Sequence, residues 1–201
     1  MAKHIVLFSG SFNPMHIGHL CLANYVAELH PDVDEVWLMV TPANPFKSHT
    51  HLLDEDFRVR WASHQIGKHP KLKVSTIELS LPRPSYTFHT LKHLREQYPD
   101  YKFTLLMGMD SLETLPRWYE GERLIKDENI LIYPRLGHDV PPSLSPLPKN
   151  ITVIDAPIFD ISATEIRSLL HQGHRLPYFL NMEVTHPLYI ELIDQLKHQP
   201  L

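Results

Sequence analysis

The sequence predicts an α/β protein: a Rossmann-like open parallel sheet with helices on both faces. Three observations support this fold class. Short, strongly apolar runs alternate with segments of helical periodicity along the chain, which is typical of βαβ units. The spacing of these units favours a parallel sheet buried on both sides. The 201 residues, 43% of them hydrophobic, are enough for one domain with a substantial core.

The first half of the chain predicts three strands and three helices. Apolar runs indicate strands at His4–Phe8 and Glu35–Val40, and a less regular alternation indicates one at Lys71–Leu79. Apolar residues at helical spacing predict helices over 17–29, from Asp54 to about 66, and over Thr87–Gln97. A loop rich in proline and asparagine, residues 41–53, precedes the second helix.

The second half predicts three further strands: Lys102–Met107, Asn129–Tyr133 and Ile151–Ile154. A helix is expected at about 118–126, another beginning at Ser162, and a terminal one at about 185–198. The proline-rich stretch 136–150 is too short for a linker between domains and is expected to be a surface loop. We therefore expect a single domain over residues 1–201, with a C-terminal helical extension from about residue 177.

Composition argues against several classes of protein. The formal net charge is −4, which disfavours a protein that grips duplex nucleic acid through its phosphates. The single cysteine, Cys21, excludes an internal disulfide and a cysteine-rich zinc module. No targeting segment and no apolar run of membrane-spanning length is visible, so a cytoplasmic location is the default expectation. The unusual features are 15 histidines and only 7 glycines.

The segment after the first strand has the composition of an anion site. It reads Gly-Ser-Phe-Asn-Pro-Met-His-Ile-Gly-His from Gly10 to His19 and leads directly into a helix. Backbone N–H groups of the loop and of the helix start can bind phosphate, and His16 and His19 lie one turn apart beside them. An ordinary strand-to-helix turn with two incidental histidines is the alternative. The P-loop pattern and the Gly-x-Gly-x-x-Gly fingerprint are both absent.

A second candidate anion site follows the last strand. Residues 161–167 read Ile-Ser-Ala-Thr-Glu-Ile-Arg, and Ser162 with Glu165 can form a capping box at a helix start. Ser162, Thr164 and Arg167 together would also suit phosphate, through hydroxyl groups, free N–H groups and a guanidinium. Because ligands of open parallel sheets bind at the carboxyl ends of strands, two such sites indicate a bound polyphosphate.

With these two motifs the chain resembles the nucleotidylyltransferase superfamily, and within it the bacterial nicotinate-nucleotide adenylyltransferases. The resemblance covers roughly residues 4 to 180. Further segments that match are Thr41–Lys47, Arg83–Thr87, Gly108–Asp110 with Trp118-Tyr119, and Tyr133–Arg135. Two positions depart from the family pattern: Phe46 stands where the family often has histidine, and Ala163 where it often has serine.

The resemblance implies transfer of the adenylyl group of ATP to nicotinate mononucleotide, which gives nicotinate adenine dinucleotide and pyrophosphate in NAD biosynthesis. It implies Mg²⁺ held mainly by ATP oxygens and water, with no protein metal site. The catalytic residues it implies are His16, His19, Lys47 and Arg167. The ATP contacts it implies are Gly10, Ser11, Phe12, His16, Gly18, His19, Gly108, Asp110, Ile161, Ser162, Thr164 and Arg167. The acceptor contacts it implies are Ser11, Asn44, Lys47, Tyr86, Thr87, Trp118, Tyr119 and Arg135.

Several of these residues have structural alternatives. Asp110 can accept a hydrogen bond from a ribose hydroxyl or cap the next helix. Trp118 can stack on a pyridine ring or pack on Leu115 and Leu124. Arg83 and Arg135 can contact anions or lie solvated on the surface.

Other functions remain as alternatives. The letters His-Ile-Gly-His at 16–19 also occur in class I aminoacyl-tRNA synthetases, but the chain is short and lacks their Lys-x-Ser-Lys pattern. A nucleotidylyltransferase with nicotinamide mononucleotide or pantetheine phosphate as acceptor is a nearer rival. A histidine-rich metal-binding protein is a more remote one, with the pairs His49/His51, His89/His93 and His171/His174. The expected partners are small-molecule substrates, not nucleic acid or membrane, and a homo-oligomer is left open.

Overall fold

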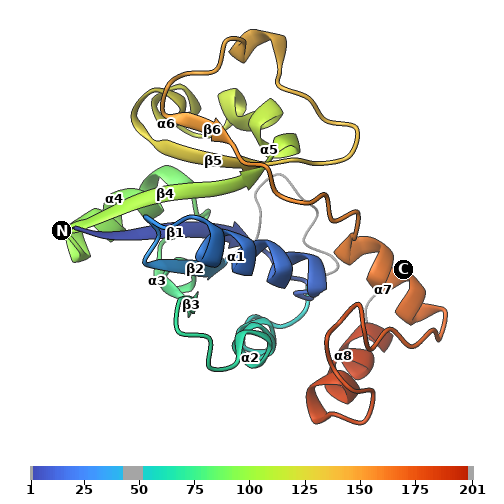
Figure 1. The fold of residues 1–201 in the computed structure, drawn as a ribbon. Helices are drawn as coiled ribbons and strands as arrows, with labels where there is room; N and C mark the ends of the chain where they lie inside the picture. The colour runs from blue at the N-terminus through green and yellow to red at the C-terminus, as the bar shows by residue number, and fades with distance from the viewer. Residues whose placement is uncertain (1, 43–51, 199–201) are drawn as a thin grey trace.

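The computed structural model describes residues 2–42 and 52–198, and in them one parallel sheet has the strand order β3-β2-β1-β4-β5-β6 (Figure 1). This order confirms the predicted Rossmann-like fold class. The strands are β1 (Lys3–Gly10), β2 (Glu35–Val40), β3 (Leu72–Ser75), β4 (Tyr101–Gly108), β5 (Asn129–Tyr133) and β6 (Ile151–Val153). Within the described residues, no helix is long and apolar enough to cross a membrane.

Helices connect the strands and cover the sheet. They are α1 (Ile17–Leu29), α2 (Glu55–Ile66), α3 (Ile77–Ser80), α4 (Thr87–Gln97), α5 (Met109–Thr114), α6 (Gly121–Asp127), α7 (Ala163–His171) and α8 (Pro187–Lys197). Two short 3₁₀ helices, η1 (Leu115–Arg117) and η2 (Pro142–Leu144), lie in the connections. Asp54 starts α2 as its N-cap and accepts a hydrogen bond from the Phe57 N–H, at 3.1 Å.

The two faces of the sheet bury separate apolar clusters, and the central strand β1 contributes to both. Val6 and Phe8 pack into the cluster under α1, α2, α7 and α8, whereas Ile5 and Leu7 pack into the one under α4, α5 and α6. Successive side chains of a strand point to opposite faces, so a strand buried on both sides must be apolar throughout. This is why the run from His4 to Phe8 is so strongly apolar.

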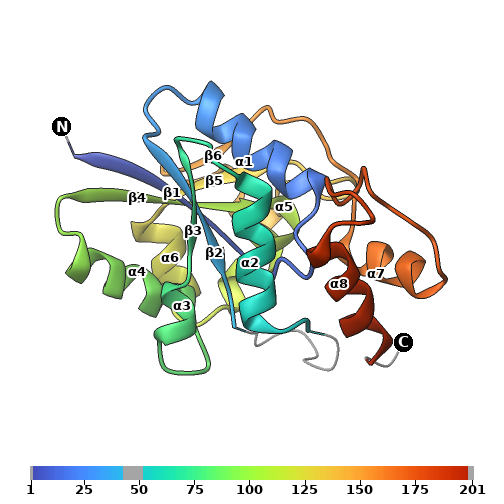
Figure 2. The ribbon, with the colours of Figure 1, turned by 90° about the horizontal axis from the view of Figure 1, so that it is seen from below.

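The C-terminal helices belong to the first of these clusters. Leu192 and Leu196 of α8 are buried in the same group of side chains as Val6 of β1. Figure 2 shows α8 running beside α2, and hydrogen bonds between the two helices confirm the contact. We therefore propose that residues 1–201 form one domain, in which the C-terminal extension is part of the fold.

The strand order reverses next to β1, and this reversal determines where a ligand can bind. β1 pairs with β2 on one side and with β4 on the other, so the connections after β1 and β4 leave toward opposite faces. A crevice opens at the carboxyl ends of strands at such a point. The last residues of β1 and β4 are Gly10 and Gly108. The Gly10–His19 segment and residues 161–167 both lie at this edge of the sheet.

Two of the predicted elements have the wrong bounds. The strand expected at Lys71–Leu79 ends at Ser75, because the Ser75 hydroxyl accepts a hydrogen bond from the Ile77 N–H at 3.4 Å and the chain turns into α3. The helix expected at 118–126 begins only at Gly121. Trp118 is extended and Glu120 is left-handed, with φ of 54°, so the helical structure is interrupted between η1 and α6.

Candidate active site

A cavity of about 400 Å³ lies at the carboxyl ends of the central strands. Its wall joins segments that are far apart in the sequence: the loop after β1, the start of α7, and the connections after β3, β4 and β5. Nearly all of the predicted site residues that the structure describes border it. They are Gly10, Ser11, Phe12, His16, His19, Tyr86, Thr87, Asp110, Trp118, Tyr119, Arg135, Ile161, Ser162, Thr164 and Arg167.

A few of the predicted residues do not line this cavity. Gly18 borders a much smaller adjoining pocket of about 20 Å³, which it shares with His16. Gly108 lies directly behind the wall, where a Cβ atom would meet Tyr133 and Arg135 at 3.1 and 3.2 Å. Asn44 and Lys47 fall within residues 43–51, outside the described part of the chain, and so does Phe46.

The loop after β1 makes one end of the cavity. Phe12 has a φ of 44°, a left-handed conformation that is costly for a residue with a side chain. Its ring packs edge-on against Phe8 at 5.6 Å and against His19 at 5.2 Å. The ring also approaches Gly10 so closely that a Cβ there would lie 3.1 Å from it. Strain of this kind is common where a loop binds a ligand.

The two histidines of the first motif lie against each other at this end. Their ring centroids are 3.8 Å apart, and the main-chain N–H of His16 donates a hydrogen bond to His19 Nδ1 at 3.3 Å. Because His19 Nδ1 accepts this bond, the neutral His19 ring carries its proton on Nε2. His19 therefore has an N–H donor on the side of the ring that faces away from the main chain of His16.

His16 is buried, with 4% of its surface exposed. Burial, together with the positive charge of Arg135, lowers its pKa to about 4, so the ring is neutral at physiological pH. In the described parts of the chain, His16 Nδ1 is the one buried side-chain nitrogen or oxygen without a hydrogen-bond partner. An unpartnered buried polar atom is rare in native proteins, and the residue that carries this one also borders the cavity.

The second motif meets the first across the cavity. The Ser162 hydroxyl accepts a hydrogen bond from the Glu165 N–H at 3.4 Å and caps α7, which confirms this half of the predicted capping box. Arg167 donates to the Asn13 carbonyl at 2.7 Å and to the Thr164 hydroxyl at 3.4 Å. Burial lowers the pKa of Arg167 from its usual value, but an arginine remains charged. The guanidinium thus connects both motifs.

The end of β4 contributes a charged pair. Asp110 Oδ1 lies 3.6 Å from Arg135 Nε, and both side chains are partly exposed to the cavity. Gly108 is the N-cap of α5 and Asp110 lies inside the first turn, so the capping alternative for Asp110 is wrong. Tyr133 lies behind the pair, and burial raises its pKa to about 12, so its hydroxyl stays protonated.

Aromatic side chains make the other end of the cavity. The rings of Tyr86 and Tyr119 stack at 4.8 Å, which brings the segments after α3 and η1 together. Trp118 is partly buried against the apolar cluster that contains Leu115 and Leu124, and it also lines the cavity. Its Nε1–H donates to the Thr114 hydroxyl at 3.2 Å. The packing interpretation of Trp118 is thus confirmed, and stacking on a pyridine ring stays a prediction for the part of the side chain that borders the cavity.

Glu78 borders the aromatic end and was missed at the level of sequence. Its carboxyl group is buried, which raises the pKa to about 7, and it accepts a hydrogen bond from the Thr90 hydroxyl at 3.1 Å. Arg83 lies away from the cavity and pairs with Glu55 at 2.8 Å, which supports the surface interpretation. No spacing pattern singles out Glu78, because its burial depends on the packing of α3 against β2 and α4.

The histidine and acidic side chains are spread over the structure. No group of three histidine, cysteine, aspartate or glutamate side chains comes together within residues 2–42 and 52–198. His89 and His93 lie on α4, and His49 and His51 fall outside the described residues. Asp110 borders the cavity and is paired with Arg135. A cation that enters bound to a ligand's oxygens and water would need few protein ligands.

A parallel sheet of this order, with the starts of α1 and α7 at one cavity by its switch point, is typical of the α/β nucleotide-binding proteins. The chain belongs to the cytidylyltransferase-like family, whose model matches residues 7–169, and within it to the nicotinate-nucleotide adenylyltransferases. It is a nucleotidyltransferase by this membership.

The relatives share most of their length with this chain. A probable nicotinate-nucleotide adenylyltransferase of Bacteroides fragilis is 47% identical over 189 residues, which cover 94% of this chain and 90% of the relative. A protein of the same name from Flavobacterium johnsoniae is 43% identical over 182 residues, covering 90% and 93%. The nicotinic acid mononucleotide adenylyltransferase of Plasmodium falciparum, solved in complex with NaAD, matches with a TM-score of 0.78. It is 23% identical, and 98% of this chain and 97% of that one are covered, so this match bears on the fold.

Proposed function

We propose that this protein transfers the adenylyl group of ATP to nicotinate mononucleotide and releases pyrophosphate, with nicotinate adenine dinucleotide as product. The observation that carries the proposal is the cavity itself, which joins the starts of α1 and α7 to an aromatic end. The names of the relatives support the choice of acceptor. The proposal places the reaction in the cytoplasm, where ATP is supplied.

The reaction needs no strong general base. The nucleophile is a phosphate monoester, and its second pKa is about 6, so it is mostly a dianion at neutral pH. The difficulty lies in bringing two anions into line and in stabilising the charge on the transferred and leaving groups. Donors fixed around the reacting phosphates are therefore the main requirement, and the described wall offers several.

Each donor has a role in this proposal. His16 is neutral and has an unpartnered nitrogen, and it contacts the α-phosphate. His19 and the start of α7, with Ser162, Thr164 and Arg167, bind the β- and γ-phosphates. A neutral imidazole donates a hydrogen bond without the cost of burying a charge. Lys47 contacts phosphates of both substrates in the proposal, although it lies outside the described residues.

The acceptor occupies the aromatic end in this proposal. Trp118 provides a flat surface for the pyridine ring, and Thr87 and the main chain of Tyr119 hold its carboxylate. Asp110 accepts a hydrogen bond from a ribose hydroxyl. Mg²⁺ enters with ATP, bound chiefly by phosphate oxygens and water, and supplies positive charge to the triphosphate.

The test compares acceptors. The protein is incubated with ATP, Mg²⁺ and either nicotinate mononucleotide, nicotinamide mononucleotide or pantetheine phosphate, and pyrophosphate release is measured. We expect turnover to be fastest with nicotinate mononucleotide. The variant His16→Ala, purified in parallel, should turn over at least about a hundredfold more slowly, because one oriented donor typically contributes 10²–10³ in rate. Release with pantetheine phosphate but not with nicotinate mononucleotide would show that the acceptor is misassigned.

A further inference from the structure

Helix α2 carries three polar side chains that are buried although none of them borders the cavity. Arg58, Trp61 and Gln65 lie one turn apart and share a face of the helix. All three donate hydrogen bonds to main-chain carbonyl groups of other segments. Arg58 is completely buried and forms no ion pair within the part of the chain that the structure describes.

The Arg58 guanidinium ties together the segments that follow β1 and β2. Nη1 donates to the Ser11 and Thr41 carbonyls, each at 2.7 Å, and both of these residues line the cavity. Nη2 donates to the Pro42 carbonyl at 3.2 Å, and Nε to the Leu53 carbonyl at 3.1 Å. One side chain therefore fixes four carbonyls in three segments of chain.

The loop after β1 is held at every second carbonyl. Ser11 is bound by Arg58, Asn13 by Arg167 at 2.7 Å, and Met15 by the Trp61 indole N–H at 2.8 Å. In a trans peptide the carbonyl and the following N–H point in opposite directions. The bond from Arg58 to the Ser11 carbonyl therefore turns the Phe12 N–H away from α2.

The same bonds explain how a strained residue persists in this loop. Phe12 has a φ of 44°, and its two neighbours are the ones whose carbonyls are bound by arginine side chains. The Asn13 side chain is fixed as well, because Oδ1 accepts from the Leu53 N–H at 2.9 Å. A conformation of this kind is kept only where the surroundings determine it.

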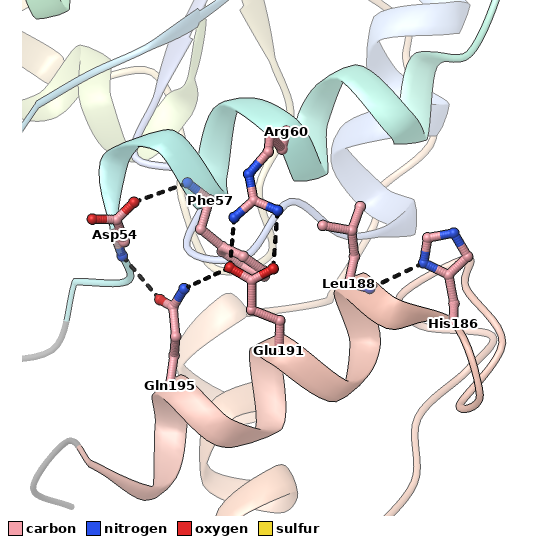
Figure 3. Close-up of polar contacts among 7 residues, drawn as sticks. All are labelled: Asp54, Phe57, Arg60, His186, Leu188, Glu191 and Gln195. Atoms are coloured by element: carbon pink, nitrogen blue, oxygen red, sulfur yellow. Dashed lines mark hydrogen bonds and ion pairs between the residues drawn. The ribbon is translucent and has the colours of Figure 1, made fainter.

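Helix α2 is itself held from the outside by α8, as Figure 3 shows. Gln195 Oε1 accepts from the Asp54 N–H at 3.0 Å, and the Arg60 guanidinium pairs with both oxygens of Glu191 at 2.9 and 2.5 Å. Arg60 is thus an arginine two residues from Arg58 that faces solvent and α8 rather than the loop. It provides a matched control.

We propose that Arg58 is a positioning residue for the adenylyl transfer proposed above: it holds the loop of residues 11–16 in the strained conformation that presents its N–H groups to a phosphate chain. Trp61 supports the same loop at Met15. Arg58 touches no substrate in this proposal and acts through the loop. The inference rests on the proposed function for its kinetic consequence, but its structural part does not.

The test uses Arg58→Lys, which keeps the charge and loses the fork of donors, and Trp61→Phe, which keeps a ring and loses the N–H. Arg60→Lys is the control. Hydrogen exchange of the amides in residues 10–17 is measured first, together with thermal unfolding. We expect at least tenfold faster exchange in this segment for Arg58→Lys, a smaller increase for Trp61→Phe and none for Arg60→Lys. The amides of the strands should keep their protection in all three variants.

Kinetics then separate positioning from general stability. Arg58→Lys should lower kcat at least tenfold and change KM for the acceptor less than threefold, at a temperature where the variant is fully folded. Wild-type exchange in residues 10–17, or wild-type kcat per folded molecule, would overturn the proposal. If the wild-type protein turns over none of the acceptors, the proposed function fails. The dissociation constant for inorganic pyrophosphate then replaces kcat, with a tenfold weaker value expected for Arg58→Lys and an unchanged value counting against the inference.

Discussion

Replacing His16 with glutamine should make the protein less sensitive to acid. His16 has a pKa of about 4 in the folded protein because it is buried near Arg135, against about 6.5 in an unfolded chain. Between these values the unfolded state binds more protons, so stability is fully present above pH 6.5 and is lost as the pH falls toward 4. Glutamine cannot be protonated in this range, so His16→Gln does not lose this part of its folding stability as the pH falls.

The size of the effect follows from the shift. The difference between the folded and unfolded pKa of His16 corresponds to about 3 kcal/mol of folding free energy. About 2 kcal/mol of this stability has been lost by pH 5. We therefore expect the free energy of unfolding of wild type to fall between pH 7 and pH 5 by about 2 kcal/mol more than that of His16→Gln. His16 is almost fully buried, so solvent screening reduces this number little.

The assay is urea unfolding at pH 7, 6 and 5, without nucleotide, followed by tryptophan fluorescence. His174→Gln, which replaces an exposed histidine, is the matched control for the substitution itself. Comparing variants cancels the contributions of the other titrating groups. Parallel pH dependences for wild type and His16→Gln, or an imidazole resonance of His16 with a midpoint near pH 6.5, would refute the assignment of a buried neutral ring.

Two glycine substitutions separate damage to the site from damage to the fold. In Gly18→Ala the new Cβ would lie 3.2 Å from His16 Nδ1, so we expect about tenfold lower kcat with little change in melting temperature; unchanged kcat would show that the ring adjusts freely. In Gly121→Ala the new Cβ would collide with the backbone carbonyl of Leu115. We expect the free energy of unfolding in urea to fall by about 2–4 kcal/mol. A fall of less than about 1 kcal/mol would show that the turn can shift.

The residues that could be predicted from the sequence are those whose chemistry is local. The Gly10–His19 segment and residues 161–167 follow strands and begin helices, so their backbone donors and side chains are defined by neighbours in the chain. The order of the strands places both segments at one edge. The predictions for β1, β2 and β5 succeeded for a similar reason, since a strand buried on both sides is apolar at every position.

The residues that were missed depend on contacts between distant segments. Arg58 looks like a solvated charge on a helix, because its four carbonyl partners lie up to 47 residues away. Glu78 falls within the strand predicted at Lys71–Leu79, and only packing makes its carboxyl group buried and raises its pKa. The helix expected from Trp118 begins only at Gly121, because Trp118 is extended and Glu120 is left-handed, and apolar spacing does not reveal these backbone conformations.

The two apolar clusters end at different points of the chain, and this difference has a consequence for synthesis on the ribosome. The cluster under α4, α5 and α6 draws on residues 5 to 151, whereas the one under α1, α2, α7 and α8 is complete only with Leu196. At ordinary translation rates the intervening residues take roughly 2 to 9 seconds to make. For that time the second face of the sheet has only α1 and α2 to cover it, and α2 is not yet held by α8.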